Sequence, residues 1–198
     1  ARVAVMMPNL LQDPVCIYAI LRARFTVVNC NPLYTPRELE HQLKDSGAKV
    51  IVILENFAST LQQVIDAVPT KKVVLASMGD MLGLVKGMLV NHVVRKVKKL
   101  VPAFDLPGAV GFKEALARGA GKTMTRAQVG PDDLAVLQYT GGTTGLSKGA
   151  MLLHRNLVAN LLQCDAWYGP AVAKVPAGQQ FTMVCALPIY HVFGFTAC

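Results

Sequence analysis

Residues 25–54 read FTVVNCNPLYTPRELEHQLKDSGAKVIVIL, and this stretch decides the fold class. It contains two short strand-like runs, residues 25–29 and 49–54, on either side of an amphipathic pattern. Thr35-Pro36-Arg37-Glu38 is a capping box with proline at the first helical position, and Gly47 suits a helix end. The stretch therefore predicts a strand, a helix and a second strand in succession.

The same alternation continues on both sides of this stretch. Helical apolar spacing covers residues 9–23 and 56–67, and residues 72–76 form a further strand-like run. A short helix is expected at 112–118 and another strand at 134–139. Near-continuous Val, Ile and Leu strands between amphipathic helices are typical of a parallel sheet covered on both faces. We therefore predict a doubly wound α/β fold, with mainly parallel sheets and flanking helices.

The composition narrows the class of protein. The chain has 198 residues, of which 53% are hydrophobic and 16% charged, and this excludes disorder as the main state. Its five cysteines are odd in number and widely spaced, so we expect neither a disulfide framework nor a structural zinc site. A net charge of +8 favours an anionic partner. Since basic and aromatic residues are not interleaved, we expect no nucleic acid as a partner.

The first residues, ARVAVMMP, lack the charged region and long apolar stretch of a signal peptide. No uninterrupted apolar run approaches the ~20 residues that a membrane-spanning helix needs. Together with the cysteine usage, these observations lead us to expect a cytoplasmic protein. Ala1 lies in a strand-like run and Cys198 in the expected first turn of a helix, so we expect a piece of a longer protein.

Residues 80–101 read DMLGLVKGMLVNHVVRKVKKLV and are predicted to be helical throughout. The basic residues of this segment are Lys86, Arg95, Lys96, Lys98 and Lys99. Such a basic amphipathic helix can lie on an anionic membrane, here the inner face of the cell membrane, with its apolar face at the headgroup boundary. The alternative is a surface helix that docks on the protein by its apolar face, with the cations at its negative end.

The composition turns to Gly, Pro and polar residues after Pro102, and this segment ends at Gly130-Pro131-Asp132-Asp133. We interpret it as a connection between two lobes. Residues 1–130 would form a first α/β lobe that carries the basic helix, and residues 131–198 the start of a second lobe.

Residues 140–149 read TGGTTGLSKG and directly follow the strand predicted at 134–139. The glycines let the backbone turn sharply and present N–H groups to an anion, while three threonines add hydroxyls and Lys148 a mobile positive charge. The spacing differs from a Walker A loop and from a dinucleotide fingerprint. We interpret the stretch as a loop for a polyphosphate with its metal ion, the alternative being a flexible polar turn.

Residues 139–149 resemble the phosphate-loop signature of the acyl-adenylate-forming superfamily, which includes acyl-CoA synthetases, peptide-synthetase adenylation domains and luciferases. Residues 150–157 (AMLLHRNL) look like the family's continuation into the following helix. Residues 187–194 (LPIYHVFG) resemble its next motif, an apolar strand that ends in proline and an aromatic–His pair. Residues 29–35 (NCNPLYT) and the basic helix are similar to bacterial long-chain fatty acid–CoA ligases. The resemblance implies part of the large N-terminal domain of an acyl-CoA synthetase-like fold, with the phosphate loop at 139–149.

The resemblance also implies which residues bind ATP. Thr140 is expected near the metal ion, and Thr143, Thr144 and Lys148 are expected to hold the β- and γ-phosphates. The residues of this nucleotide site are Thr140, Gly141, Gly142, Thr143, Thr144, Gly145 and Lys148.

His191 is implied to lie beside the acyl carboxylate and the nucleotide, where it helps to place the carboxylate. Outside this motif, a histidine between aromatic residues would be interpreted as a satisfied core residue. We therefore take Lys148 and His191 as the candidate catalytic residues. His41 and His92 are interpreted as helix-surface residues and receive no role.

The implied reaction has two steps, in which a carboxylate attacks the α-phosphorus of MgATP and the thiol of coenzyme A then displaces AMP. The resemblance thus implies ATP, Mg²⁺, coenzyme A as co-substrate and a long-chain fatty acid. Two alternatives stay open: a nucleotide- or phosphate-binding module without ligase activity, and a ligase for a short-chain, aryl or amino acid. The sequence is also compatible with a homodimer.

Two residues depart from the family pattern. Arg24 stands where related chains usually have glycine, which would suit a left-handed helix end, and Ser147 replaces a proline common in the loop. Family members continue with an acidic metal partner, an adenine-binding segment and a mobile C-terminal lobe that carries a catalytic lysine. These parts are not among the 198 residues, so we expect the chain alone to be inactive.

Overall fold

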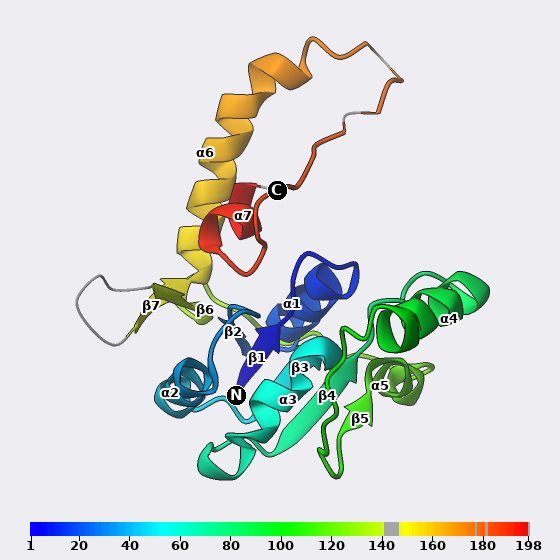
Figure 1. Cartoon of the computed structure of the whole chain (residues 1–198). Coiled ribbons are helices and arrows are strands. Elements are labelled where there is room, and N and C mark those ends of the chain that lie inside the picture. Colours follow the sequence, from blue (N-terminus) through cyan, green and yellow to red (C-terminus); the bar gives the residue numbers. More distant parts are fainter. Residues whose placement is uncertain (141–146, 177, 181, 198) are drawn as a thin grey trace.

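The computed structural model of the chain describes residues 1–140, 147–176, 178–180 and 182–197. Across these ranges, seven strands form one sheet with the order β5-β4-β3-β1-β2-β6-β7. The strands are β1 (Arg2–Met6), β2 (Thr26–Asn29), β3 (Val50–Leu54), β4 (Lys72–Ala76), β5 (Val110–Gly111), β6 (Leu134–Thr140) and β7 (Lys148–Leu153). Figure 1 shows this sheet between helices.

The sheet is parallel from β5 to β6, and its last pair, β6 with β7, is antiparallel. Strand β1 pairs with β2 on one side and with β3 on the other, so the direction of chain winding reverses at β1. This topology confirms the predicted doubly wound, mainly parallel α/β fold.

Helices cover both faces of the sheet. They are α1 (Gln12–Arg22), α2 (Pro36–Ser46), α3 (Ala58–Gln62), α4 (Leu84–His92), α5 (Phe112–Gly119), α6 (His154–Val172) and α7 (Val192–Ala197). Ile17, Phe112 and Leu157 bring α1, α5 and the first turn of α6 into one buried cluster with the strands. Leu39 and Leu61 bring α2 and α3 into a second cluster, on the other face. Among the described residues, no helix has the length and hydropathy to cross a membrane.

The capping box predicted for α2 is confirmed. The Thr35 side chain accepts a hydrogen bond from the Glu38 backbone N–H at 3.4 Å, and the Thr35 backbone N–H donates to Glu38 Oε2 at 2.8 Å. The hydrogen bonds from Thr35 hold the pKa of the Glu38 carboxyl below its usual range. The helix ends at Gly47, which has φ +65°.

The prediction that residues 80–101 are helical throughout is wrong at both ends. The helix α4 begins at Leu84 because Gly83 has φ +79°, outside the helical region, and residues 78–81 form a turn. A π-helical turn, Val93–Val97, follows α4, and Lys99 at φ +51° ends the helical segment.

Two further predicted elements differ from the structure. The helix predicted at 56–67 is divided into a 3-10 turn, the short α3 and a second 3-10 turn. Residues 148–153 form β7, because they pair with β6 across the phosphate loop, and α6 begins only at His154. The division into two lobes at residue 130 remains a prediction, and the strands on either side of it share one sheet.

Candidate active site

The candidate site lies at one edge of the sheet. Because β2 is parallel to both β1 and β6, the carboxyl ends of these three strands lie together, and we call this the carboxyl edge. Asn9 follows β1, Asn31 follows β2 and Thr140 ends β6. Ligands of open α/β sheets bind outside the carboxyl ends of the strands. The opposite edge, at the amino ends of β2 and β6, is called the amino edge below.

The structure brings Thr140 and Lys148 together. These residues lie opposite each other in the β6–β7 register, at the base of the phosphate loop, and both are exposed. The other predicted ATP-binding residues, Gly141, Gly142, Thr143, Thr144 and Gly145, lie outside the described residues and remain predictions. A hydroxyl and an ammonium group on either side of a glycine-rich stretch of sequence suit a phosphate anion.

Tyr139 fixes the base of this loop to α2. Its hydroxyl donates a hydrogen bond to Asp45 Oδ2 at 2.5 Å, and burial together with this bond raises the pKa of Tyr139 well above its usual range. A Cβ atom at Gly149 would lie 2.9 Å from Cζ of the Tyr139 ring. The last glycine of the motif is therefore explained by packing against Tyr139.

His41, which was interpreted as a helix-surface residue without a role, contacts the loop. Its Nε2 lies 3.0 Å from the backbone carbonyl oxygen of Ser147. Since a carbonyl oxygen can only accept, Nε2 is the protonated nitrogen in this contact. The two residues are 106 positions apart. An amphipathic helix pattern identifies the surface of α2 but not its neighbour, so sequence reasoning missed this contact.

The resemblance implies an apolar strand that ends in proline within the 187–194 motif, and the structure does not form it. Residues 182–186, which precede this motif, have no regular secondary structure either. In the described part of the chain no strand pairs with them. Instead, the Asn9 side chain donates from Nδ2 to the carbonyl oxygens of Leu187 at 2.8 Å and Cys185 at 3.3 Å. Its Oδ1 accepts from the backbone N–H of Ile189 at 2.8 Å. A side-chain amide thus supplies hydrogen bonds that a neighbouring strand would otherwise make.

A second amide links β6 to the same segment. Gln138 Nε2 donates to the carbonyl oxygen of Tyr190 at 3.0 Å, while its Oε1 accepts from Asn29 Nδ2 at 3.3 Å. Gln42 Nε2 in turn donates to the Asn29 carbonyl oxygen at 2.7 Å. Gln138, Asn29 and Gln42 are all buried. These contacts place His191, which follows Tyr190, at the carboxyl edge.

His191 itself is exposed and lies just before α7. Its Nδ1 accepts a hydrogen bond from the backbone N–H of Phe193 at 3.3 Å. The neutral ring therefore carries its proton on Nε2, which can donate to an oxygen of an anionic ligand. A Cβ atom at Gly194 would clash with the carbonyl oxygen of Pro188, so glycine is required where α7 packs against this segment.

Thr140 is also the residue that the resemblance places near Mg²⁺. Among the described residues, no group of three His, Cys, Asp or Glu side chains could hold a metal ion. Nucleotide-bound Mg²⁺ is commonly held by substrate phosphates with only one or two carboxylates. The single hydroxyl of Thr140 fits a metal that the phosphates hold, with Thr140 as one further oxygen ligand.

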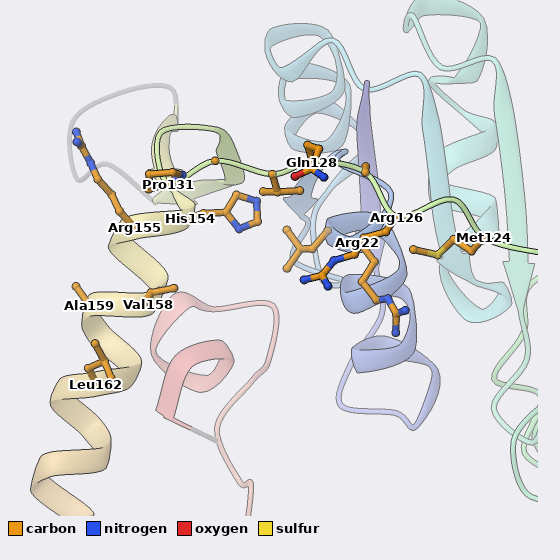
Figure 2. A pocket seen from close by; sticks show the side chains of 14 residues that line it. Arg22, Met124, Arg126, Gln128, Pro131, His154, Arg155, Val158, Ala159 and Leu162 are labelled. Carbon is orange, nitrogen blue, oxygen red and sulfur yellow. The ribbon is translucent and has the colours of Figure 1, made fainter.

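A cavity of about 1080 Å³ lies at the amino edge, away from this site. Figure 2 shows it between the end of α1, residues 124–131 and the start of α6. Its basic lining residues are Arg22, Arg126, His154 and Arg155. Thr140, Lys148 and His191 do not line it, so this cavity is separate from the candidate site.

Comparison with known proteins shows which enzymes the chain is similar to. The chain is 55% identical over 195 residues to a long-chain-fatty-acid–CoA ligase from Escherichia coli O157:H7. The aligned part is 98% of this chain but 34% of that protein. A long-chain-fatty-acid-CoA ligase from Archaeoglobus fulgidus has a similar structure, with a TM-score of 0.65 and 26% identity over 98% of this chain and 32% of that one. ATP-bound MatB from Rhodopseudomonas palustris gives a TM-score of 0.62 and 26% identity over 99% of this chain and 32% of that chain.

The chain thus spans about one third of the length of the relatives it matches. These likenesses confirm the resemblance to acyl-adenylate-forming enzymes that the motifs indicated. The family model described as AMP-binding enzyme matches residues 1–198. The chain belongs to the AMP-binding enzyme family.

Proposed function

We propose that the full-length protein carrying this chain converts a long-chain fatty acid into its coenzyme A thioester through an acyl-adenylate, with release of pyrophosphate and AMP. The observation that carries the proposal is the joint position of Thr140, Lys148 and the segment before His191 at the carboxyl edge. Identity of 55% to a protein named long-chain-fatty-acid–CoA ligase supports the fatty acid as substrate. The chain alone lacks two thirds of that relative's length, so we expect turnover only from the full-length protein.

In the first step a carboxylate oxygen bonds to the α-phosphorus of ATP, and the bond from that phosphorus to the pyrophosphate oxygen breaks. Lys148 would neutralise the charge of the β- and γ-phosphates as pyrophosphate leaves. Removing one such electrostatic donor costs roughly 2–4 kcal/mol of transition-state stabilisation. Mg²⁺ bound to the phosphates would supply further charge neutralisation, with Thr140 as a ligand.

His191 would act on the attacking carboxylate. With Nδ1 occupied by the Phe193 N–H, its Nε2–H is the group that can donate to a carboxylate oxygen. Such a hydrogen bond orients the acid for attack, and correct placement of two reactants is a large part of catalysis. Coenzyme A would then attack the acyl carbon, with AMP as the leaving group.

Fatty-acid-dependent exchange of labelled pyrophosphate into ATP tests the proposal. The full-length protein is expected to exchange label with long-chain acids, and less with short-chain, aryl or amino acids at equal concentration. The same assay on residues 1–198 alone should show none. Exchange that prefers another acid would assign a different ligase. ATP binding without exchange for any acid would favour the alternative, a nucleotide-binding module without ligase activity.

We also propose that the full-length protein is cytoplasmic and contacts an anionic membrane through α4 and the π-helical turn. The inward face of this segment carries few large apolar side chains. Gly87 packs on Gly79, Asn91 accepts from the Gly79 N–H at 2.7 Å, and Arg95 pairs with Glu55 at 2.8 Å, while Val94 is a buried apolar residue of the π-helical turn. Large apolar side chains instead lie outward, at least 53% exposed. They are Leu84, Val85, Met88, Leu89, Val97 and Leu100.

Exposed Lys86 and Lys96 lie on the same segment, and exposed Lys98 and Lys99 follow it directly. This arrangement supports a headgroup contact rather than docking of the apolar face on the protein. Co-sedimentation of the full-length protein with phosphatidylglycerol vesicles is expected, and it should weaken in the double variant Lys96→Glu/Lys98→Glu but not in Lys122→Glu. Equal sedimentation of all three proteins would reject this surface. A homodimer built on the same face would appear as a concentration-dependent mass without vesicles.

A further inference from the structure

We infer that Asn9 and Gln138 are positioning residues, which hold residues 185–190 at the carboxyl edge and thereby set His191 relative to the phosphate loop. The inference rests on the proposed function for the role of His191. It goes beyond that function because neither amide belongs to the phosphate loop or to the His motif.

The Asn9 contacts reproduce the pattern of a strand pairing. Its amide bonds the backbone at Cys185, Leu187 and Ile189, which are spaced two residues apart. Alternate residues of an extended chain direct their backbone groups to the same side. One planar amide therefore meets three backbone groups of this segment, and it uses both its donor and its acceptor.

Gln138 connects this segment to the phosphate loop. It lies two positions before Thr140, and the carbonyl it binds belongs to Tyr190, the residue before His191. Its other side-chain atom is bound by Asn29, so the amide orientation is fixed on both sides. Because Gln138 is 5% exposed, water cannot easily replace a lost partner.

Replacing each amide by the acid of the same shape changes its hydrogen bonds without changing the volume of the side chain. Asn9→Asp keeps the acceptor for the Ile189 N–H but loses both donations, to Leu187 and Cys185. Gln138→Glu keeps an acceptor for Asn29 but cannot donate to the Tyr190 carbonyl. Gln63→Glu is the matched control, because Gln63 is exposed directly after α3 and its Nε2 donates to the Ser59 carbonyl oxygen at 3.1 Å, away from the site.

The experiment uses the full-length protein and measures pyrophosphate exchange together with amide hydrogen exchange of residues 185–191. We expect kcat to fall about tenfold in each of the two site variants, with the KM for ATP nearly unchanged, since a misplaced reacting group lowers turnover more than binding. Backbone amides of 185–191 should exchange faster in both. The control should match wild type in every readout, and thermal unfolding identifies the fraction of folded protein.

A kcat that falls only in proportion to the fraction of folded protein would indicate a purely structural role for these residues and would overturn the inference. So would faster amide exchange with wild-type kcat. If Gln138→Glu does not fold, Asn9→Asp at an exposed position still decides the question. Absence of pyrophosphate exchange in the wild-type protein would instead reject the proposed function, whereas normal wild-type exchange with unaffected variants rejects this inference alone.

Discussion

The two edges of the same sheet hold their loops in different ways. At the amino edge, Arg24 and Asp133 form an exposed ion pair at 3.3 Å. At the carboxyl edge, the neutral amides of Asn9 and Gln138 hold residues 185–190. Exposed ion pairs contribute little to stability and weaken with salt, whereas a hydrogen bond of a buried amide such as Gln138 is costly to break. Asn9 is exposed, but its one amide bonds three backbone groups. The difference indicates that accurate placement is concentrated at the edge where the candidate site lies.

The largest effect is expected at the carboxyl edge, from Lys148→Ala. Loss of its positive charge should lower the kcat of pyrophosphate exchange about 10²–10³-fold in the full-length protein, as for other electrostatic donors. Lys122→Ala, which removes an exposed lysine outside the site, should leave turnover unchanged. Equal rates in wild type and Lys148→Ala would exclude this residue from the reaction.

A buried acid near the same edge should make stability depend on pH. Asp13 in the first turn of α1 is 2% exposed, and burial raises its pKa to about 7. The folded state thus binds the Asp13 proton more tightly than the unfolded state does. The contribution of protonated Asp13 to the free energy of unfolding is therefore fully present below about pH 4, and it is lost as the pH rises through about 7. In Asp13→Asn this loss should disappear, which is a difference of about 2–4 kcal/mol above pH 7.

Urea unfolding of wild type and Asp13→Asn at about pH 5 and about pH 8 measures this difference. Asp66→Asn, at an exposed carboxylate, provides the control and should follow the wild-type pH dependence. A wild-type stability that rises between the two pH values would show that Asp13 is ionised at low cost in the folded state.

A smaller effect is expected from Gly194→Ala. The new Cβ would clash with the Pro188 carbonyl oxygen, so α7 must move away from the segment that Asn9 holds. Such overpacking typically costs about 1–3 kcal/mol, and pyrophosphate exchange should fall with it. Gly119→Ala meets nothing within 4 Å and should be neutral in both assays. Full activity of Gly194→Ala would show that the packing of α7 does not affect the site.

The smallest effect belongs to the amino edge. Arg24 has φ +59°, so Arg24→Gly relieves left-handed strain while it removes the exposed pair with Asp133. We expect a net gain of about 0.5 kcal/mol in the free energy of unfolding, and a larger gain at high salt, where the pair is screened. Thermal unfolding at two salt concentrations measures it. A loss of stability at low salt that disappears at high salt would mean that the pair, rather than the strain, dominates at this corner.

Much of the fold followed from local patterns. The capping box at Thr35, Gly47 at the end of α2 and the apolar run at 72–76 each specify structure within a few residues, and each prediction was confirmed. The strained position of Arg24 was also predicted, because a side chain stands where a left-handed helix end favours glycine. Each of these features depends on residues that are close together in the sequence.

The remaining features depend on partners far along the chain. His41 meets Ser147 across 106 residues, and Asn9 meets Ile189 across 180, so neither contact has a local signature. The orientation of α4 was equally hidden, because close packing of Gly87 on Gly79 directs its small face inward. A hydropathy pattern shows which face is apolar but not which face another glycine can approach.

The contact between Asn9 and Ile189 also bears on synthesis of the protein. With 180 residues between the two partners, a ribosome that adds about 5–20 residues per second needs roughly 10–40 s to supply the second one. Strands β1 to β4 can pair during this interval, whereas the backbone that Asn9 will bind is not yet made. The nascent chain therefore has time to build its sheet before the carboxyl edge can close over it.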